Sequence, residues 1–170
     1  TALAYLIPIV LIVLLLSTSS WVEPILFLVT IGVAVLINMG TNIFFGEISF
    51  MTQSISPILQ MAVSLDYAIF LLHSYDEYKS KTDDIKEAMA MAMKKSFSAI
   101  IASAATTLFG FLALLFMEFR IGPDLGLNLA KGIFISFITV MLFLPSLTLT
   151  FNDLLIKTKH KRLVPGFRNI

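Results

Sequence analysis

The sequence predicts an all-α membrane protein whose core is a bundle of five transmembrane helices. Of its 170 residues, 58% are hydrophobic and 14% are charged, and the mean hydropathy is +0.92. These values lie outside the range of soluble domains and within that of multi-pass membrane proteins. Five apolar stretches are each long enough to cross about 30 Å of hydrocarbon at about 1.5 Å per residue. The lysines and arginines also gather on one side of the predicted membrane.

The five stretches form a predicted transmembrane domain over residues 1–153, and a basic tail or linker follows at 154–170. The predicted spans run approximately over 2–18, 24–45, 54–75, 96–117 and 125–152. The second span opens at Glu23-Pro24, where a proline suits the first helical turn and an acid suits the positive helix end. Ser56-Pro57 predicts the same kind of start for the third span.

Positive charge divides unequally between the two sides that the alternating spans define. One side carries ten basic residues, which are Lys79, Lys81, Lys86, Lys94, Lys95, Lys157, Lys159, Lys161, Arg162 and Arg168. The other side carries two, Arg120 and Lys131. By the positive-inside rule, this asymmetry predicts an external N-terminus and a cytoplasmic C-terminus in the cell membrane. The odd number of spans leads us to expect that a further span and an external domain precede Thr1 in a longer parent chain.

The connector at 83–95 has the pattern of a short amphipathic helix on the cytoplasmic side. Asp84 and Glu87 resemble an acidic capping box. An apolar stripe with helical spacing follows, made of Ile85, Ala88, Met89, Ala92 and Met93. We expect this helix to lie on the inner membrane interface, and a helix that binds a partner is the alternative. We expect the basic tail to anchor the topology near anionic lipid and not to bind nucleic acid.

Asp66 is the residue of this sequence that most needs an explanation. It interrupts an otherwise apolar helix about 15 Å along the axis from Ser56, close to the middle of the membrane. Acids at this depth are rare and mark proton or ion paths, because a carboxylate in hydrocarbon is costly. Its neighbour Tyr67 has a phenol that can donate a hydrogen bond to a carboxylate on an adjoining helix. The alternative is a carboxyl group that only fixes packing.

Other polar side chains near mid-membrane are candidates for accessory roles. His73 lies seven residues after Asp66 and so on the same helix face, where it either relays a proton or marks the membrane edge. Asn38 and Asn42 share one face of the second span, and with Ser64 they either hydrogen-bond between helices or line a cavity beside Asp66. Lys131 either extends to the outer surface or serves as a counter-ion within the membrane.

A ridge of small residues follows the fourth span and predicts a close approach of another helix. Its members are Ser98, Ala102, Thr106 and Gly110, at steps of four residues. Thr106 or the adjacent Thr107 is also a candidate to offer a hydroxyl group to Asp66. Packing remains the simpler interpretation of the ridge.

Several classes of site are missing from the sequence. The chain has no cysteine, and no metal-ligand spacing, phosphate-binding loop or nucleophile elbow is present. We therefore expect neither a metal nor a cofactor, and the chain is not expected to be a self-contained enzyme.

The segment Ser64–His73, with the Asp66-Tyr67 pair inside it, resembles the Asp-Tyr span of the MMPL family, which belongs to the RND superfamily of transporters. The likeness extends over nearly the whole chain. It includes Ala102–Phe111, Leu129–Ile133, Leu144–Leu147 and Asn38–Asn42.

This resemblance implies that the chain is spans two to six of one half of a twelve-span exporter, with the first half favoured. The exporter would be driven by the proton motive force, as a proton antiporter for efflux of lipids or other hydrophobic compounds. Asp66 and Tyr67 would form the proton relay and meet their counterparts in the second half. A porter domain and that second half would be the missing partners, with membrane lipids around them. Alternatives are a sterol-sensing-like regulatory or scaffold bundle and a protein-export accessory of the same superfamily.

Overall fold

The computed structural model describes residues 2–17 and 21–157, and it confirms the all-α fold. The helices are α1 (Ala2–Ser17), α2 (Glu23–Thr41), η1 (Asn42–Phe45), α3 (Phe50–Lys79), α4 (Ile85–Ala113), η2 (Leu114–Phe116), α5 (Ile121–Thr150) and α6 (Asn152–Lys157). No strand occurs among these described residues. Most of the predicted basic tail, from residue 158 onward, lies outside the described part of the chain.

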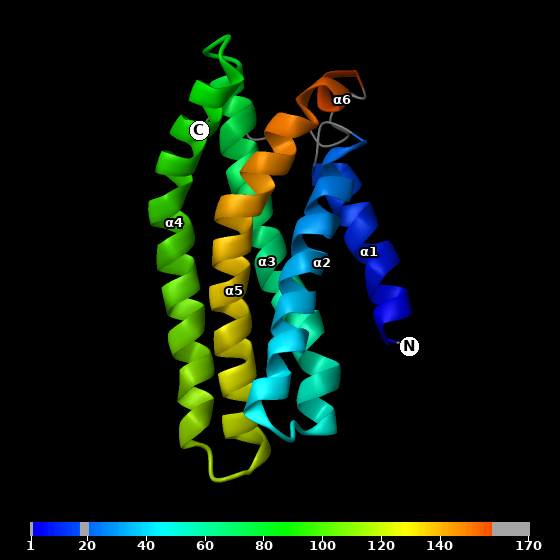
Figure 1. Ribbon diagram of the computed structural model, residues 1–170, viewed down its shortest axis with the longest axis vertical. Coiled ribbons are helices and arrows are strands. Elements are labelled where there is room, and N and C mark those ends of the chain that lie inside the picture. The colour runs from blue at the N-terminus through cyan, green and yellow to red at the C-terminus, as the bar shows by residue number, and fades with distance from the viewer. Residues whose placement is uncertain (1, 18–20, 158–170) are drawn as a thin grey trace.

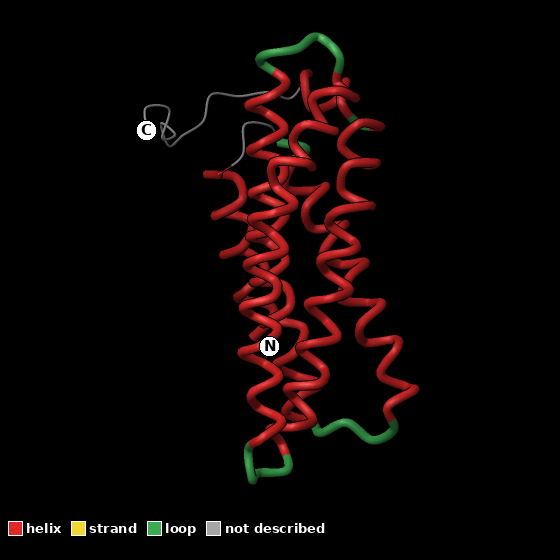
Figure 2. The backbone as a smooth tube through the Cα atoms, turned by 90° about the vertical axis from the view of Figure 1, so that its left-hand side faces the viewer, coloured by secondary structure: helices red, strands yellow, loops and turns green. Residues whose placement is uncertain are grey.

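Four long helices, α2 to α5, run side by side along the long axis of the molecule, and α1 lies at the margin of the bundle (Figures 1 and 2). Successive long helices alternate in direction, so that α3 and α5 are parallel to each other. By length and apolar character, the helical segments Glu23–Phe45, Phe50–Lys79, Ile85–Phe116 and Ile121–Thr150 are each able to span a membrane. The first predicted span also forms a helix, α1, but its apolar part, Ala4–Leu16, is shorter.

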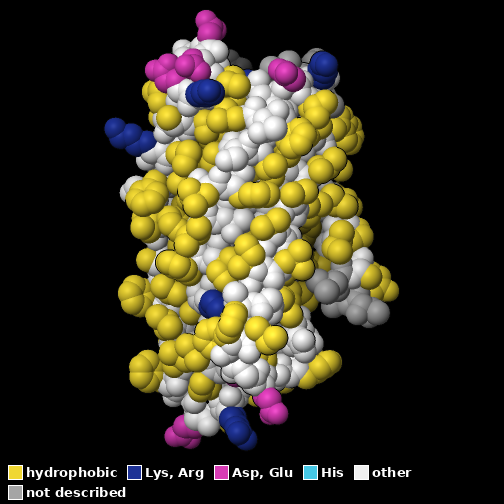
Figure 3. Space-filling model, in the orientation of Figure 1, with side chains coloured by type: hydrophobic (Ala, Val, Ile, Leu, Met, Phe, Trp, Pro, Cys, Tyr) yellow, Lys and Arg dark blue, Asp and Glu magenta, His cyan; other side chains and the backbone are white. Residues whose placement is uncertain are grey.

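The outer surface of the bundle has the pattern expected of a protein surrounded by lipid. Charged side chains gather near the two ends of the molecule, and the sides between them are largely hydrophobic (Figure 3). Large apolar side chains are exposed along these sides, among them Leu36, Phe109 and Leu142. In water such a surface would drive aggregation, whereas in a bilayer it meets lipid chains of the same character.

The start of the third span differs from the prediction. Pro24 does occupy the first turn of α2, as expected. In contrast, α3 begins at Phe50 and contains Pro57 in its interior. Ser49 is the N-cap, and its side chain accepts a hydrogen bond from the backbone N–H of Thr52. This cap satisfies the first turn, so the helix begins earlier than the proline suggested.

The prediction of a separate short amphipathic helix at 83–95 is wrong. Asp84 caps a helix as expected, by accepting from the backbone N–H of Lys86. That helix is α4, which continues without a break to Ala113. No glycine or proline stands between the connector and the fourth span to end the helix. One buried stripe runs through both parts at steps of four residues, made of Ala88, Ala92, Ser96, Ile100 and Ala104.

Polar contacts fasten the helices at the predicted cytoplasmic end. The Glu77 carboxylate of α3 pairs with Lys81 at 3.0 Å and with Lys95 of α4 at 2.6 Å. The Asn152 side chain of α6 accepts hydrogen bonds from the hydroxyl of Tyr75 (3.1 Å) and the ammonium of Lys79 (2.8 Å). These contacts tie the start of α6 to the last turns of α3.

Candidate functional site

The predicted proton-relay pair lies near the middle of α3, and its two side chains point in different directions. Adjacent residues of an α-helix are separated by about 100° around the axis. Tyr67 is 2% exposed and points into the bundle, whereas Asp66 is exposed. Within the described chain, no hydrogen bond or ion pair reaches the Asp66 carboxylate. The acid therefore lies on an outer face of this bundle and not in its interior.

Asp66 belongs to an exposed strip of α3. Ala62 and Phe70, one turn before and after it, are exposed, and so is His73. His73 thus shares the face of Asp66, as its spacing predicted. The strip combines one acid with apolar and small side chains at membrane depth, where ionisable residues usually face a bundle interior or a water-filled cavity. The strip is therefore a candidate contact surface.

The small-residue ridge of α4 is also exposed. Ser98, Ala102, Thr106 and Gly110 all face outward, on the side of the helix opposite its buried stripe. The hydroxyl of Thr106 donates to the carbonyl of Ala102 at 2.9 Å, within its own helix. Because a hydroxyl has one hydrogen to donate, Thr106 is not a donor to Asp66 in this structure. No neighbour within the described chain makes use of the close approach that this ridge permits.

Tyr67 occupies the inner side of α3. Its phenol oxygen is buried and has no hydrogen-bond partner in the described structure. Thr107 of α4 lies close to the phenol, although the two hydroxyls do not meet the geometry of a hydrogen bond, and the Thr107 hydroxyl donates to the carbonyl of Ser103 at 2.9 Å. A buried phenol without a partner is uncommon, and such groups recur at functional positions.

A buried polar cluster joins α2, α3 and α5, and Gln60 is at its centre. The Gln60 amide nitrogen donates to the carbonyls of Ala34 and Gly132, both at 3.2 Å, and to the hydroxyl of Ser136 at 3.1 Å. Its oxygen accepts from the Asn38 amide at 2.8 Å. Gln60 is 1% exposed and Asn38 is 0% exposed. One side chain of α3 therefore binds both α2 and α5.

Polar contacts between the parallel helices α3 and α5 repeat at a fixed interval. On each helix the participating residues are four positions apart, and each contact joins residues that are 72 positions apart. We call these four pairs the polar ladder: Thr52 with Asp124, Ser56 with Asn128, Gln60 with Gly132, and Ser64 with Ser136. The next positions at the same interval, Ala68 and Val140, are both 0% exposed and apolar. The ladder is therefore confined to the predicted outer half of the two helices.

Lys131 is bound at the end of α2 and does not pair with Asp66. Its ammonium donates to the carbonyl of Asn38 at 3.0 Å and to the side-chain oxygen of Asn42, and it lies 4.7 Å from the centre of the Phe45 ring. The last carbonyls of a helix carry a partial negative charge and lack helical partners. The Lys131 ammonium therefore stabilises the C-terminal end of α2, which replaces the counter-ion role considered from the sequence.

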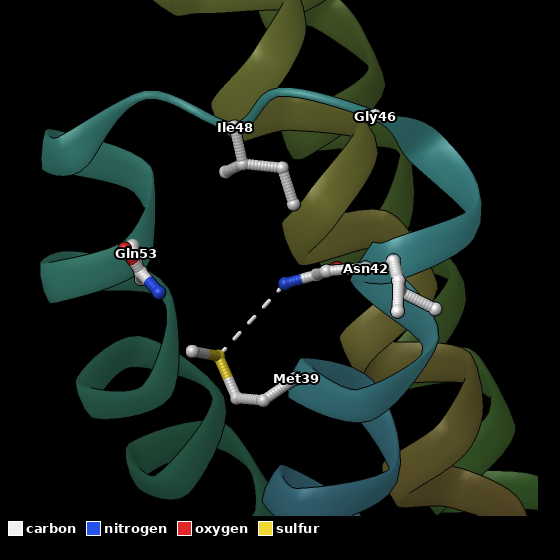
Figure 4. Close-up of a pocket in the computed structure, with 6 residues that line it drawn as sticks. Met39, Asn42, Gly46, Ile48 and Gln53 are labelled. Atoms are coloured by element: carbon white, nitrogen blue, oxygen red, sulfur yellow. Dashed lines mark hydrogen bonds between the residues drawn. The ribbon is translucent and has the colours of Figure 1, made fainter.

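Two cavities open beside this end of the bundle. One has a volume of about 330 Å³ and is lined by Met39, Asn42, Ile43, Gly46, Ile48 and Gln53. In the close-up, the side chains of Asn42 and Gln53 point toward the space between α2 and α3, and the Asn42 amide reaches the sulfur of Met39 at 3.9 Å (Figure 4). The second cavity, of about 90 Å³, includes Asp124 and Lys131 among its lining residues. Among the described residues, no group of three or more His, Asp or Glu side chains is placed to hold a metal ion.

The structure thus divides the predicted site residues into two groups. Asn38, Asn42, Ser64 and Lys131 belong to the buried polar cluster. Asp66, His73, Thr106 and Thr107 lie on or beside the outward faces of α3 and α4. Tyr67 belongs to neither group and lies on the inward side of α3. Sequence reasoning missed Asn128, Ser136 and Asp124, which complete the ladder on α5. These three residues are separated by multiples of four positions, as the polar residues of α3 are, and this spacing was the signal that marked them.

Comparison with known proteins shows the family of this chain. The family model described as "MMPL family" matches residues 1–170, the whole chain. The chain belongs to the MMPL family.

Relatives of this MMPL chain include transport proteins of mycobacteria. It is 31% identical to the probable transport protein MmpL12 of Mycobacterium tuberculosis, over 83% of this chain and 13% of that protein. It is 30% identical to the sulfolipid-1 exporter MmpL8 of the same organism, over 81% of this chain and 13% of that protein. It is also 34% identical to the putative membrane protein ActII-3 of Streptomyces coelicolor, over 59% of this chain and 14% of that protein. The chain therefore spans about one seventh of the length of these relatives and is a multi-pass membrane segment of their family.

Proposed function

We propose that this chain is the transmembrane half of an MMPL-type exporter driven by the proton motive force, with Asp66 and Tyr67 as the proton relay. The observation that carries the proposal is the position of Asp66, exposed near the middle of a membrane-length helix without a partner in the described chain. A carboxylate facing lipid at that depth costs at least about 2.5 kcal/mol. Another protein segment is therefore needed to cover this face and to contact the Asp66 carboxyl group.

The second half of the parent chain is the cover that fits this face. The exposed ridge of α4 would permit a helix of that half to approach closely, because small residues allow backbones to come near each other. Asp66 would then lie at the contact between the halves, with the buried phenol of Tyr67 one residue away. A group at such a contact influences how the two halves pack.

Proton binding at Asp66 would change this contact between the halves. An ionised carboxylate needs hydrogen-bond donors or an opposite charge, whereas the protonated acid is neutral and fits an apolar contact. A cycle of protonation from outside and release to the cytoplasm would therefore alternate two packings of the halves. This gives the proton gradient a means to drive transport.

Lipids or other hydrophobic compounds are the proposed cargo. The relative MmpL8 is named a sulfolipid-1 exporter, and the bundle offers its sides to membrane lipid. In this proposal the N-terminus of the chain is external, the C-terminus is cytoplasmic, and the membrane is the cell membrane. A porter domain outside the membrane would precede this chain and contribute to the choice of cargo.

The test is to replace Asp66→Asn in the full-length parent protein. Asparagine keeps the shape of the side chain but cannot exchange a proton, so gradient-driven export should be abolished while expression and membrane insertion stay normal. Tyr67→Phe should impair export less, because it removes a hydrogen-bonding group and not the titrating one. Asp83→Asn, the same change in the exposed α3–α4 turn, is the matched control. Export by the Asp66→Asn protein at the wild-type rate, still dependent on the gradient, would contradict the proposal and favour a regulatory bundle.

A further inference from the structure

We infer that the polar ladder, together with the hydrogen bonds of Gln60 to Asn38 and Ala34 of α2, locks α2, α3 and α5 into one rigid unit that carries Asp66 through the transport cycle, with Gln60 as its positioning residue. This inference rests on the proposed function, because it concerns how the helix that bears the proton site is held. It assigns a role to buried polar groups that the proton relay does not use.

The first argument is the direction of the polar side chains of α3. Ser56, Gln60 and Ser64 are 0%, 1% and 0% exposed, and they follow one another at steps of four residues on the inward face. Asp66 is on the outward face of the same helix. In hydrocarbon there is little hydrophobic force between helices, so packing and hydrogen bonds decide which helices stay together. The inward face of α3 therefore holds the helix in place, and the outward face remains free for the proton site.

The second argument is that the ladder permits one register only. A Cβ atom built on Gly132 would lie 2.8 Å from the Asn38 amide nitrogen and 3.1 Å from the Gln60 side chain. The space opposite Gln60 is therefore free only because residue 132 has no side chain. A shift of α3 by one step along α5 would bring Gln60 opposite Asn128 or Ser136, where a side chain already lies. A shift would also strand buried polar groups away from water, which is strongly unfavourable.

The third argument is that α5 binds the two helix ends that flank the connection between α2 and α3, which are the end of α2 and the start of α3. The Asp124 carboxylate accepts hydrogen bonds from the backbone N–H of Ser49 (2.9 Å) and the hydroxyl of Thr52 (2.8 Å), at the positive start of α3. The Lys131 ammonium binds the negative end of α2. Each charge matches the dipole of the helix end that it contacts. The two charges of α5 thus act on α2 and α3 together.

The consequence is a division of the outer half of the bundle, where side-chain hydrogen bonds join α2, α3 and α5, whereas the ion pair that joins α4 to α3 lies at the predicted cytoplasmic end. No polar side chain of α4 joins the ladder, and α4 exposes its ridge. Movement driven at Asp66 should therefore occur between the locked unit and its neighbours, not between α3 and α5. A rigid unit keeps the depth and rotation of Asp66 constant while the surroundings change.

A reversible covalent lock tests this inference directly. The hydroxyls of Ser64 and Ser136 are 2.6 Å apart, and the chain has no cysteine of its own. The double variant Ser64→Cys/Ser136→Cys, in a full-length parent without other cysteines, should form a disulfide on mild oxidation. Gradient-driven export should then remain at the level of the reduced protein. Each single cysteine variant under the same oxidant is the control.

Two results would overturn the inference. Loss of export on oxidation with recovery on reduction would mean that α3 and α5 move relative to each other during transport. Failure of the pair to cross-link would mean that the two helices do not hold this register. Export that responds to Asp66→Asn but is blocked by the disulfide would refute the rigid unit alone. Export that is indifferent to Asp66→Asn would refute the proposed function instead.

The positioning role of Gln60 has its own test. Gln60→Met keeps the length of the side chain and removes all of its hydrogen bonds. We expect export per folded protein to fall severalfold and its pH profile to shift, because Asp66 is then held less firmly. Oxidation of the Ser64→Cys/Ser136→Cys pair in the Gln60→Met background should restore both, and reduction should remove the rescue. Gln53→Met, the same change at an exposed position of α3, is the matched control. An unchanged pH profile, or an absence of rescue, would contradict the positioning role.

Discussion

At the scale of single residues, two features decide how this chain is organised: a glycine and a lysine on the same turn of α5. Gly132 makes room for the Gln60 side chain, and Lys131 supplies a donor to the end of α2. Both residues are needed by their neighbours and not by α5 itself. A buried polar cluster stabilises a structure most when its groups are satisfied together. In this cluster the side-chain oxygen of Asn38 is buried and has no hydrogen-bond partner in the described structure.

The residue-scale prediction concerns Gly132→Ala. The added methyl group would overlap the Asn38 amide and press on Gln60, so the substitution should destabilise the full-length protein by about 1–3 kcal/mol. Gly40→Ala is the matched control, because a Cβ there meets nothing within 4 Å, and alanine favours a helix over glycine by about 1 kcal/mol. Thermal unfolding in detergent measures both variants. Equal melting temperatures for the two would show that the space opposite Gln60 is not tightly filled.

At the scale of elements, α3 and α4 each have two distinct faces. The inward face of α3 carries the polar ladder and its outward face carries Asp66. The inward face of α4 carries one stripe of small and apolar residues, and its outward face carries another stripe that has no neighbour in the described chain. Two small-residue stripes on one helix are expected when that helix packs on both sides.

The element-scale prediction concerns the outward ridge of α4. Ala102→Leu adds bulk where a second helix is proposed to approach, so it should lower the thermal stability and the export of the full-length parent. Phe109→Leu, at an exposed position outside the ridge, is the control and should be tolerated. The comparison uses unfolding in detergent together with the rate of export. Tolerance of Ala102→Leu in both assays would remove the ridge as a contact surface.

At the scale of the whole molecule, the charged ends and apolar sides define how the bundle sits in a membrane (Figure 3). The α3–α4 turn and α6 lie at one end, and the η1 and η2 turns lie at the other (Figure 1). The excess of lysine at the first of these ends is the basis for the proposed orientation. The ladder and the two cavities then belong to the outer half.

The prediction at this scale uses single cysteines in a chain that has none of its own. Lys81→Cys and Glu47→Cys change exposed residues at opposite ends of the bundle. In intact cells, an impermeant thiol reagent should label Glu47→Cys and leave Lys81→Cys unlabelled until the cells are permeabilised. The reverse pattern would invert the proposed orientation and would place the ladder in the cytoplasmic half.

The sequence by itself determined the membrane class, the helices and the family, because apolar length and local motifs are properties of single segments. Residues 85–113 show the limit of this reasoning. The sequence predicted an amphipathic helix followed by a separate span, but the two form one helix because no residue between them ends it. Spacing also established that Asp66 and His73 share a face, and that Asn38 and Asn42 share another.

Only the tertiary structure decided which face of each helix meets a neighbour. In a soluble protein the apolar face turns inward, but in a membrane both faces of a helix are apolar and the pattern gives little direction. The polar residues of α3 therefore looked alike in the sequence, although Gln60 and Ser64 are buried in the ladder and Asp66 faces outward. The constant separation of 72 residues between partners on α3 and α5 became visible once the two helices lay side by side. The separation is constant because the two helices run in the same direction and lie side by side. The order of the spans implies the shared direction, but it does not imply the contact.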